Sequence, residues 1–226
     1  MKRKAARRKV AGETGWMERA ARASLREAGR SLARLERRSA RAVAEAAETI
    51  VASLESGGTV YFCGNGGSAA DAQHLAAELA GRYLGERPAI AAVALTTNSS
   101  ALTAIGNDYG FERVFARQLE GVGTAGDVLV AISTSGGSPN VLAAIEAAHR
   151  QGMTVVGLTG LGGRRFAALC DLALVTPSDA TPRIQEGHIA MGHTLCELVE
   201  RAMFPVRARG GRRVARGARR ARKARR

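Results

Sequence analysis

The sequence predicts one α/β domain in which helices cover both faces of a parallel sheet. The first observation behind this fold class is that short apolar runs alternate with helical segments after Gly57-Gly58. Continuous apolar runs are typical of strands that are buried on both faces of a parallel sheet. The second observation is that 46% of the 226 residues are hydrophobic. That amount is enough to bury a core that needs no disulfide bonds.

The N-terminal part predicts a long helical segment, formed by one helix or by two in succession. Residues 16–54 are rich in Ala, Leu, Glu and Arg, contain no Pro and have only Gly29 as an interior glycine. Apolar residues recur at helical spacing, from Leu25 and Leu32 to Ile50 and Leu54. A helical arm of this length can pack against a partner subunit as readily as against its own domain.

The remaining elements follow from the alternation of strands and helices. Strands are expected at 59–63, 89–95, 128–132, 154–158 and 172–175. Helices are expected from the end of the loop 64–68 to about Tyr83 and at 99–105, 111–120, 139–150, 164–169 and 183–203. Ligands of parallel sheets bind at the carboxyl edge, where strands end and helices begin. We therefore expect the functional residues at that edge.

The formal net charge of +14 comes from the two ends of the chain. Residues 1–9 hold six Lys and Arg residues and residues 207–226 hold eleven, with no acidic residue in either run. The stretch 10–206 carries 17 basic and 20 acidic residues, a net charge of −3. We divide the chain into a basic N-terminal arm (1–15), a domain (16–206) that includes N-terminal helices at 16–56, and a disordered Arg-rich tail (207–226). The two basic ends can contact nucleic acid nonspecifically through its phosphates.

Cysteine usage and hydropathy predict a cytoplasmic protein without membrane contact. The three cysteines, Cys63, Cys170 and Cys196, are an odd and widely spaced set, which suits free thiols in a reducing compartment. No run reaches the roughly 18 to 20 apolar residues that a membrane helix needs. Residues 12–15 (GETG) stand where a signal peptide would have its apolar segment.

Two strand exits share a composition that suits an anion. The strand at 59–63 leads into Gly64-Asn65-Gly66-Gly67-Ser68, and the strand at 128–132 leads into Ser133-Thr134-Ser135-Gly136-Gly137-Ser138. Glycines let the backbone approach a phosphate, hydroxyls add donors, and the helix that follows each loop supplies free N–H groups and the positive end of its dipole. Either loop alone is also compatible with a connection that binds nothing. The two together favour a monophosphate.

Two larger ligand classes fit these loops poorly. Neither loop has the lysine of a P-loop, which argues against hydrolysis of a nucleoside triphosphate. The first loop formally satisfies a dinucleotide-binding fingerprint. However, the next strand ends in Val93-Ala94-Leu95-Thr96, without the acidic residue that would bind a ribose.

Two helical residue pairs are candidates for proton transfer or metal binding. His74 and Glu78 are four residues apart, about 40° around a helix and one turn along it, on the helix that the first loop opens. A base beside an acid at a phosphate loop is suited to proton transfer, although an ordinary surface pair has the same spacing. Gln185 and His193 can face one cleft from the last helix, whereas His149 and His188 read as a surface and a helix-face histidine.

Several motifs in order resemble the phosphoheptose isomerase family of sugar isomerase (SIS) domain proteins. They are CGNGGSAADAQHLAAELAGR at 63–82, GNDYGF at 106–111, GDVLVAISTSGGS at 126–138 and RIQEGHIAMGH at 183–193. The resemblance extends over about residues 17–205. It implies a flavodoxin-like α/β fold, assembled as a homotetramer with active sites at subunit interfaces. It also implies isomerisation of D-sedoheptulose 7-phosphate to D-glycero-D-manno-heptose 7-phosphate through a cis-enediol, the first step toward nucleotide-activated heptose.

The resemblance also implies roles for individual residues. Glu78 and His193 would be the catalytic acid and base. One zinc ion per subunit would be bound by His74, Glu78, Gln185 and His193. The phosphorylated seven-carbon sugar would be bound by Asn65, Gly66, Gly67, Ser68, Glu78, Asn107, Asp108, Ser133, Thr134, Ser135, Ser138 and Gln185.

Two alternatives remain open at the level of the sequence. Some relatives of the family act as non-catalytic regulatory or assembly proteins, including a type that binds the replication initiator, and in them the positions of Glu78 and His193 hold residues that cannot exchange protons. The presence of both residues here favours the enzyme. The second alternative is an isomerase of another phosphosugar, such as an arabinose 5-phosphate or a hexose 6-phosphate, whose phosphate loops would look alike.

Overall fold

A computed structural model describes the backbone of residues 2–205 and the side chains of residues 15–205. Its centre is a five-stranded parallel sheet in the order β2-β1-β3-β4-β5. The strands are β1 (Val60–Gly64), β2 (Ala92–Ala94), β3 (Val128–Ile132), β4 (Thr154–Gly160) and β5 (Leu172–Thr176). The predicted α/β fold with a parallel sheet is confirmed.

Seven α-helices and one short 3₁₀ helix are present in the described part of the chain. They are α1 (Lys2–Glu55), α2 (Gly67–Ala80), α3 (Ser99–Tyr109), η1 (Phe111–Arg113), α4 (Ala116–Val122), α5 (Pro139–Arg150), α6 (Arg164–Ala167) and α7 (Thr181–Met203). The single helix expected at 111–120 is divided into η1 and α4, because Val114 and Phe115 turn into the core between them. The strand expected at 89–95 is shortened to three residues at the edge of the sheet, where Val93 is partly exposed.

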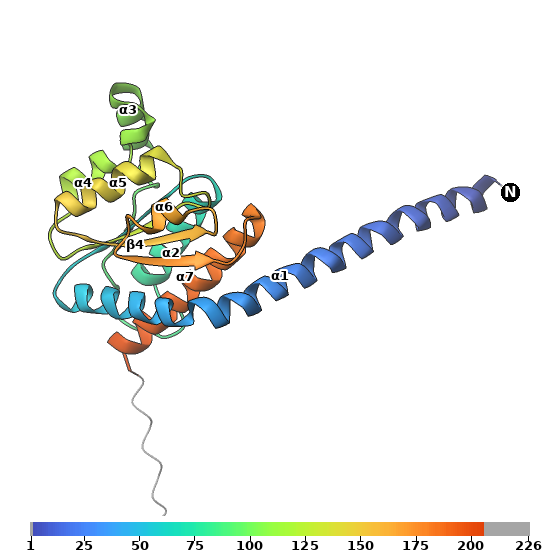
Figure 1. Ribbon diagram of the computed structural model, residues 1–226, viewed down its shortest axis with the longest axis horizontal. Coiled ribbons are helices and arrows are strands. Elements are labelled where there is room, and N and C mark those ends of the chain that lie inside the picture. The colour runs from blue at the N-terminus through green and yellow to red at the C-terminus, as the bar shows by residue number, and fades with distance from the viewer. Residues whose placement is uncertain (1, 206–226) are drawn as a thin grey trace, which may run out of the picture.

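The alternation of side chains along each strand gives the sheet two apolar faces. Val60 and Phe62 of β1 belong to the core on which α1, α2 and α7 pack. Tyr61 and Cys63 belong to the opposite core, formed with α4, α5 and α6. Figure 1 shows α4 and α5 on one side of the sheet and α1 and α7 on the other. Burial on both faces explains why the strands are continuous apolar runs.

The N-terminal segment is one continuous helix, the first of the two possibilities that the sequence allowed. From Leu35 onward α1 packs on the sheet and on α7, whereas its outer half projects from the domain (Figure 1). Residues 2–15, assigned by their charge to a basic arm, continue α1 in the structure. The predicted tail at 207–226 lies outside the described residues. Within the described part, no helix is both long and apolar enough to cross a membrane.

The register of the sheet places the two predicted phosphate loops side by side. Strands β1 and β3 are neighbours, and Gly64 pairs with Ile132 at their carboxyl ends. The first loop therefore begins next to Ser133, the first residue of the second loop. Strand order thus brings together two motifs that are far apart in the sequence.

Candidate active site

Each loop leads into a helix whose first turn has no side-chain cap. Helix α2 follows Gly66, which has a φ of 55°, and α5 follows Ser138; neither cap residue makes a side-chain hydrogen bond to its helix. The first N–H groups of a helix have no intrahelical partner, and they carry the positive end of its dipole. Two such helix starts at one edge of the sheet suit an anion.

The serine hydroxyls of the second loop make hydrogen bonds within the loop. The Oγ atoms of Ser133 and Ser138 lie 3.1 Å apart, and Ser133 Oγ also accepts from the N–H of Gly136 at 3.1 Å. Ser135 Oγ accepts from the N–H of Gly137 at 3.2 Å. Gly136 has a φ of 68° and lies so close to Phe166 that a β-carbon would collide with it. The loop is thus held in a tight bend, with the hydroxyls of Ser133 and Ser138 next to each other.

A reciprocal amide pair joins the first loop to the helix after the second. Asn65 Nδ2 donates to Asn140 Oδ1 at 2.8 Å, and Asn140 Nδ2 donates to Asn65 Oδ1 at 2.8 Å. Asn140 is buried, whereas Asn65 is half-buried. Sequence reasoning singled out Asn65 as a sugar-binding residue but missed Asn140.

Helices α2 and α7 bring together three of the four predicted metal ligands, two of which are the predicted acid and base. The Nε2 atoms of His74 and His193 are 2.8 Å apart, although the residues are separated by 119 positions in the sequence. His74 Nε2 lies 3.4 Å from Glu78 Oε1. One ligand atom from each of these three residues lies within 4.8 Å of the others. Two imidazole nitrogens and a carboxylate are a donor set that zinc accepts.

Gln185 lies at another level of the same two helices. A β-carbon on Gly67 would collide with the amide nitrogen of Gln185, so this side chain covers the start of α2. Farther along, Gly192 lies against Leu75, next to the contact between the two histidines. The helices therefore run in the same direction, and Gln185 sits about two turns before His193. The close approach at Gly192 also explains a glycine inside α7.

Asn107 and Asp108 lie on α3, which stands apart from the loops. Helix α3 has no buried residue and projects from the domain in Figure 1. Asn107 Nδ2 donates to Asp108 Oδ1 at 2.7 Å, and within the described part of the chain neither side chain bonds to the loops. Within a single chain, these two predicted sugar-binding residues therefore lie apart from the two phosphate loops.

Two further residues near the histidines were missed by sequence reasoning. Burial raises the pKa of Asp71, and electrostatic interactions with His74 and His193 oppose that rise. The buried Oδ2 of Asp71 has no hydrogen-bond partner among the described residues. The ring of Tyr83 lies 5.9 Å from that of His193, centroid to centroid. Asp71 precedes His74 by three residues, so helical spacing was a signal for it, whereas nothing local indicated Tyr83.

A buried ion pair anchors the end of α2 behind the cluster. The carboxylate of Glu200 accepts hydrogen bonds from the N–H groups of Tyr83, Leu84 and Gly85 and from Arg87 Nε, at 2.7–2.9 Å. Burial raises the pKa of Glu200, but these hydrogen bonds outweigh it and lower the pKa to about 2. Arg87 in turn donates to the carbonyl of Glu78 at 2.8 Å. The backbone of the predicted base is thus tied to α7.

His188 is a core residue and not a member of the cluster. Its side chain is fully buried, and neither ring nitrogen has a hydrogen-bond partner among the described residues. Burial lowers the pKa of His188 to about 4. The imidazole is therefore neutral at physiological pH.

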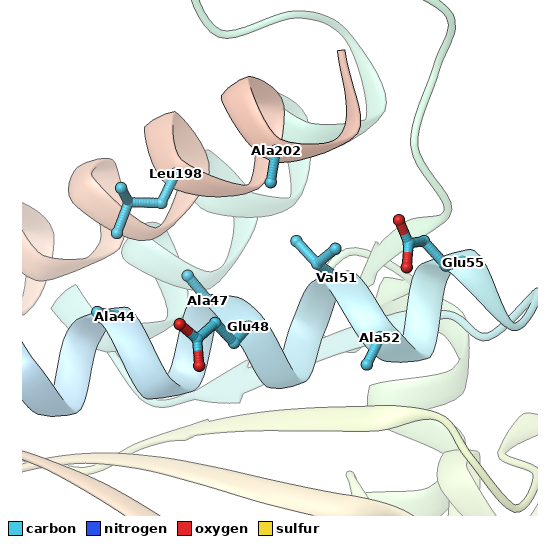
Figure 2. A pocket seen from close by; sticks show the side chains of 8 residues that line it. All are labelled: Ala44, Ala47, Glu48, Val51, Ala52, Glu55, Leu198 and Ala202. Carbon is cyan, nitrogen blue, oxygen red and sulfur yellow. The ribbon is translucent and has the colours of Figure 1, made fainter. Parts of the chain in front are cut away.

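A surface groove lies apart from these residues, between α1 and α7 (Figure 2). It has a volume of about 310 Å³ and contains none of the predicted site residues. Its lining is mostly small and apolar and consists of Ala44, Ala47, Glu48, Val51, Ala52, Glu55, Leu198 and Ala202. Such a groove suits the packing of another helix better than the binding of a phosphosugar.

Known proteins resemble this chain in both sequence and fold. Residues 25–160 match the SIS domain family. A phosphoheptose isomerase of Rhodospirillum rubrum is 63% identical over 162 residues, which are 72% of this chain and 86% of that protein. The solved phosphoheptose isomerase of Neisseria gonorrhoeae is 48% identical, with a TM-score of 0.76 over 81% of this chain and 98% of that one. That of Francisella tularensis is 37% identical, with a TM-score of 0.78 over 80% and 97%.

Proposed function

The chain belongs to the phosphoheptose isomerases of the SIS domain family and is an aldose–ketose isomerase, and we propose that it converts D-sedoheptulose 7-phosphate to D-glycero-D-manno-heptose 7-phosphate. The observation that carries the proposal is the meeting of Glu78 with His74 and His193 at the interface of α2 and α7. A carboxylate and imidazoles within 4.8 Å of one another provide proton acceptors and donors at one place.

The phosphate is held by the two loops at the carboxyl edge of β1 and β3. Ser68 and the hydroxyls of Ser133, Ser135 and Ser138 supply donors, with Thr134 between them. The uncapped starts of α2 and α5 supply N–H groups and positive dipole ends. Gly66 and Gly67 let the sugar chain approach the backbone. Anchoring the phosphate at C7 fixes the other end of the sugar relative to the proton-transfer residues.

Proton transfer is assigned to Glu78 and His193. The Glu78 carboxylate takes the proton from C1 of the ketose, giving a cis-enediol, and returns it to C2. His193 transfers the second proton from the C1 oxygen to the C2 oxygen as the carbonyl group moves from C2 to C1. Charge that develops on the sugar oxygens needs a positively charged or hydrogen-bond-donating group nearby. The hydrogen bond from Arg87 to the Glu78 carbonyl holds the base in place.

We propose that His74, Glu78 and His193 bind zinc. Their donor types and their spacing within 4.8 Å fit a zinc site with three protein ligands. When bound, zinc acts as a Lewis acid toward the sugar oxygens. The role of Gln185 as a fourth ligand stays a prediction, because its amide lies against Gly67 at the start of α2 and not beside the other three ligands.

We further propose a homotetramer with active sites at subunit interfaces. The outer half of α1 exposes Trp16, Met17 and Leu25, and the groove in Figure 2 offers room for a helix of a neighbouring subunit. Asn107 and Asp108 stand on α3, away from the phosphate loops of their own subunit, so they can line the sugar only in the active site of a neighbouring subunit.

A reducing, cytoplasmic setting is supported by three free cysteines. Burial raises the pKa of Cys63 to about 12, which keeps that thiol unreactive.

The test is turnover of the purified protein with sedoheptulose 7-phosphate, with and without a chelator. NMR follows the formation of heptose 7-phosphate, since substrate and product have one mass. We expect turnover that the chelator reduces and that added zinc restores. Absence of turnover with zinc supplied, while arabinose 5-phosphate or a hexose 6-phosphate is isomerised, would overturn the substrate assignment.

A further inference from the structure

The amide pair between Asn65 and Asn140 joins the two phosphate loops and has no role in the mechanism proposed above. The two residues are 75 positions apart and form a closed ring of two hydrogen bonds, each 2.8 Å long. Asn140 is 2% exposed. A buried amide is costly unless it is hydrogen-bonded, and here Asn65 supplies both a donor and an acceptor to it.

The pair connects the two helix starts that are proposed to hold the substrate. Asn65 stands two residues before α2, and its carbonyl accepts the N–H of Ser68 at 3.0 Å. Asn140 is the second residue of α5, directly after Pro139, which has no N–H. Within the described residues no hydrogen bond uses the N–H of Asn140, so that N–H is available to an anion at the start of the helix.

We infer that Asn140 is a positioning residue for the phosphosugar, which acts through Asn65 to fix the distance between the starts of α2 and α5. The inference rests on the proposed function of the two loops. Each carboxamide has a second N–H, so Asn65 keeps one donor for the sugar while the other is bound to Asn140. Without Asn140, the first loop would be free to move relative to the second, and the substrate would have to restrain it on binding.

A comparable set of hydrogen bonds at the amino ends of β1 and β3 serves as a control. It distinguishes a positioning role of Asn140 from a contribution to stability alone. Asp127 is also buried, and its carboxylate accepts from the N–H of Thr59 at 2.7 Å and from the N–H of Thr124 at 2.8 Å. It therefore joins the start of β1 to the start of β3, as Asn140 joins their ends. Its loss should weaken the fold without moving the two loops.

The experiment is a double-mutant cycle on the full chain with Asn65→Ala, Asn140→Ala and the double variant, and with Asp127→Ala as control. KM and kcat are measured with sedoheptulose 7-phosphate, and the Kd of inorganic phosphate is measured by calorimetry. We expect Asn140→Ala to raise KM and the phosphate Kd about tenfold, an effect of the size of one or two lost hydrogen bonds. In the Asn65→Ala background the same change should add less than about twofold, because the pair acts as a unit. Asp127→Ala should lower Tm and leave KM unchanged.

An unchanged KM and phosphate Kd in folded Asn140→Ala protein would overturn the inference. So would a tenfold effect that persists in the Asn65→Ala background, because Asn140 would then act on its own. If Asn140→Ala does not fold, Asn140→Ser and the Asn65→Ala single variant carry the same comparison. Failure of the proposed function is recognised separately, as absence of turnover in the unaltered protein, and phosphate binding remains measurable in that case.

Discussion

Glu78 is the residue on which the proposed reaction depends most. It shares one face of α2 with His74, and His193 of α7 lies against the same face. Its backbone is fixed by Arg87, so the carboxylate can be altered without removing the anchor of the helix end. This separation of backbone anchor from side-chain chemistry makes an isosteric substitution informative.

Glu78→Gln should lower kcat by about 10²- to 10⁴-fold, because an amide keeps the shape of the side chain but cannot accept the C1 proton. The measurement is turnover by NMR together with exchange of the C1 hydrogen in heavy water. Glu86→Gln is the control, since the side chain of Glu86 is 94% exposed on the loop after α2. Retention of more than a tenth of the activity in Glu78→Gln would assign the base to another residue.

His188 gives the fold an expected sensitivity to acid. Its pKa in the folded protein is lowered by burial to about 4, from an ordinary value of 6.5. Between these values the unfolded chain binds a proton that the folded chain does not. Stability is therefore lost as pH falls from 6.5 toward 4, by at most about 1.4 kcal/mol per pH unit.

His188→Leu should flatten the dependence of the unfolding free energy on pH across that window, as measured by urea unfolding at a series of pH values. His149→Leu is the control, because His149 is an exposed residue that contacts Asp171 at 3.3 Å. Equal slopes in His188→Leu and in the unaltered protein would show that the buried imidazole is not the source of the acid sensitivity.

At the scale of elements, α7 organises the site by packing along α2. It contributes His193 near the middle of the contact, Gln185 at the loop end and Glu200 at the far end. The ion pair of Glu200 with Arg87 is almost closed to solvent, with side-chain exposures of 10% and 1%. Breaking such a pair leaves a buried charge without a partner, which is far more costly than losing an exposed pair.

Glu200→Gln should reduce the free energy of unfolding by about 3–5 kcal/mol. The exposed pair of Glu197 with Arg201 on the same helix is the matched control, and Glu197→Gln should cost less than about 1 kcal/mol. Urea unfolding of both variants checks the difference. Because the Glu200 pKa is lowered to about 2, its contribution is present above pH 4.5 and is lost as pH falls toward 2. Similar losses in the two variants would contradict this account.

At the scale of the whole molecule, α1 is longer than its own domain can cover. Leu25 and Leu32 lie seven residues apart on one face of the helix and are 73% and 40% exposed. Large exposed apolar side chains in a row on a projecting helix are typical of a surface that packs on another subunit. The proposed tetramer would cover this face and bring α3 of one subunit near the loops of another.

Leu25→Glu should therefore shift the protein to a smaller assembly and reduce turnover, since the proposed sites lie between subunits. Light scattering after size-exclusion chromatography measures the mass, and the isomerase assay measures activity. Leu169→Glu, at a 47% exposed leucine beyond α6, is the matched control and should change neither. A monomeric unaltered protein with full activity would contradict the interfacial sites.

Sequence alone determined the fold class, the order of strands and helices along the chain, the two glycine- and serine-rich loops and the face shared by His74 and Glu78. These features are local, because strand burial and helical spacing are encoded within each segment. Tertiary structure alone decided that Asn65 meets Asn140, that His74 meets His193, that His188 is buried and that Asn107 and Asp108 stand on a projecting helix. Contacts across 75 or 119 residues depend on the order of parallel strands and on which helices share a face of the sheet, and no local pattern specifies either.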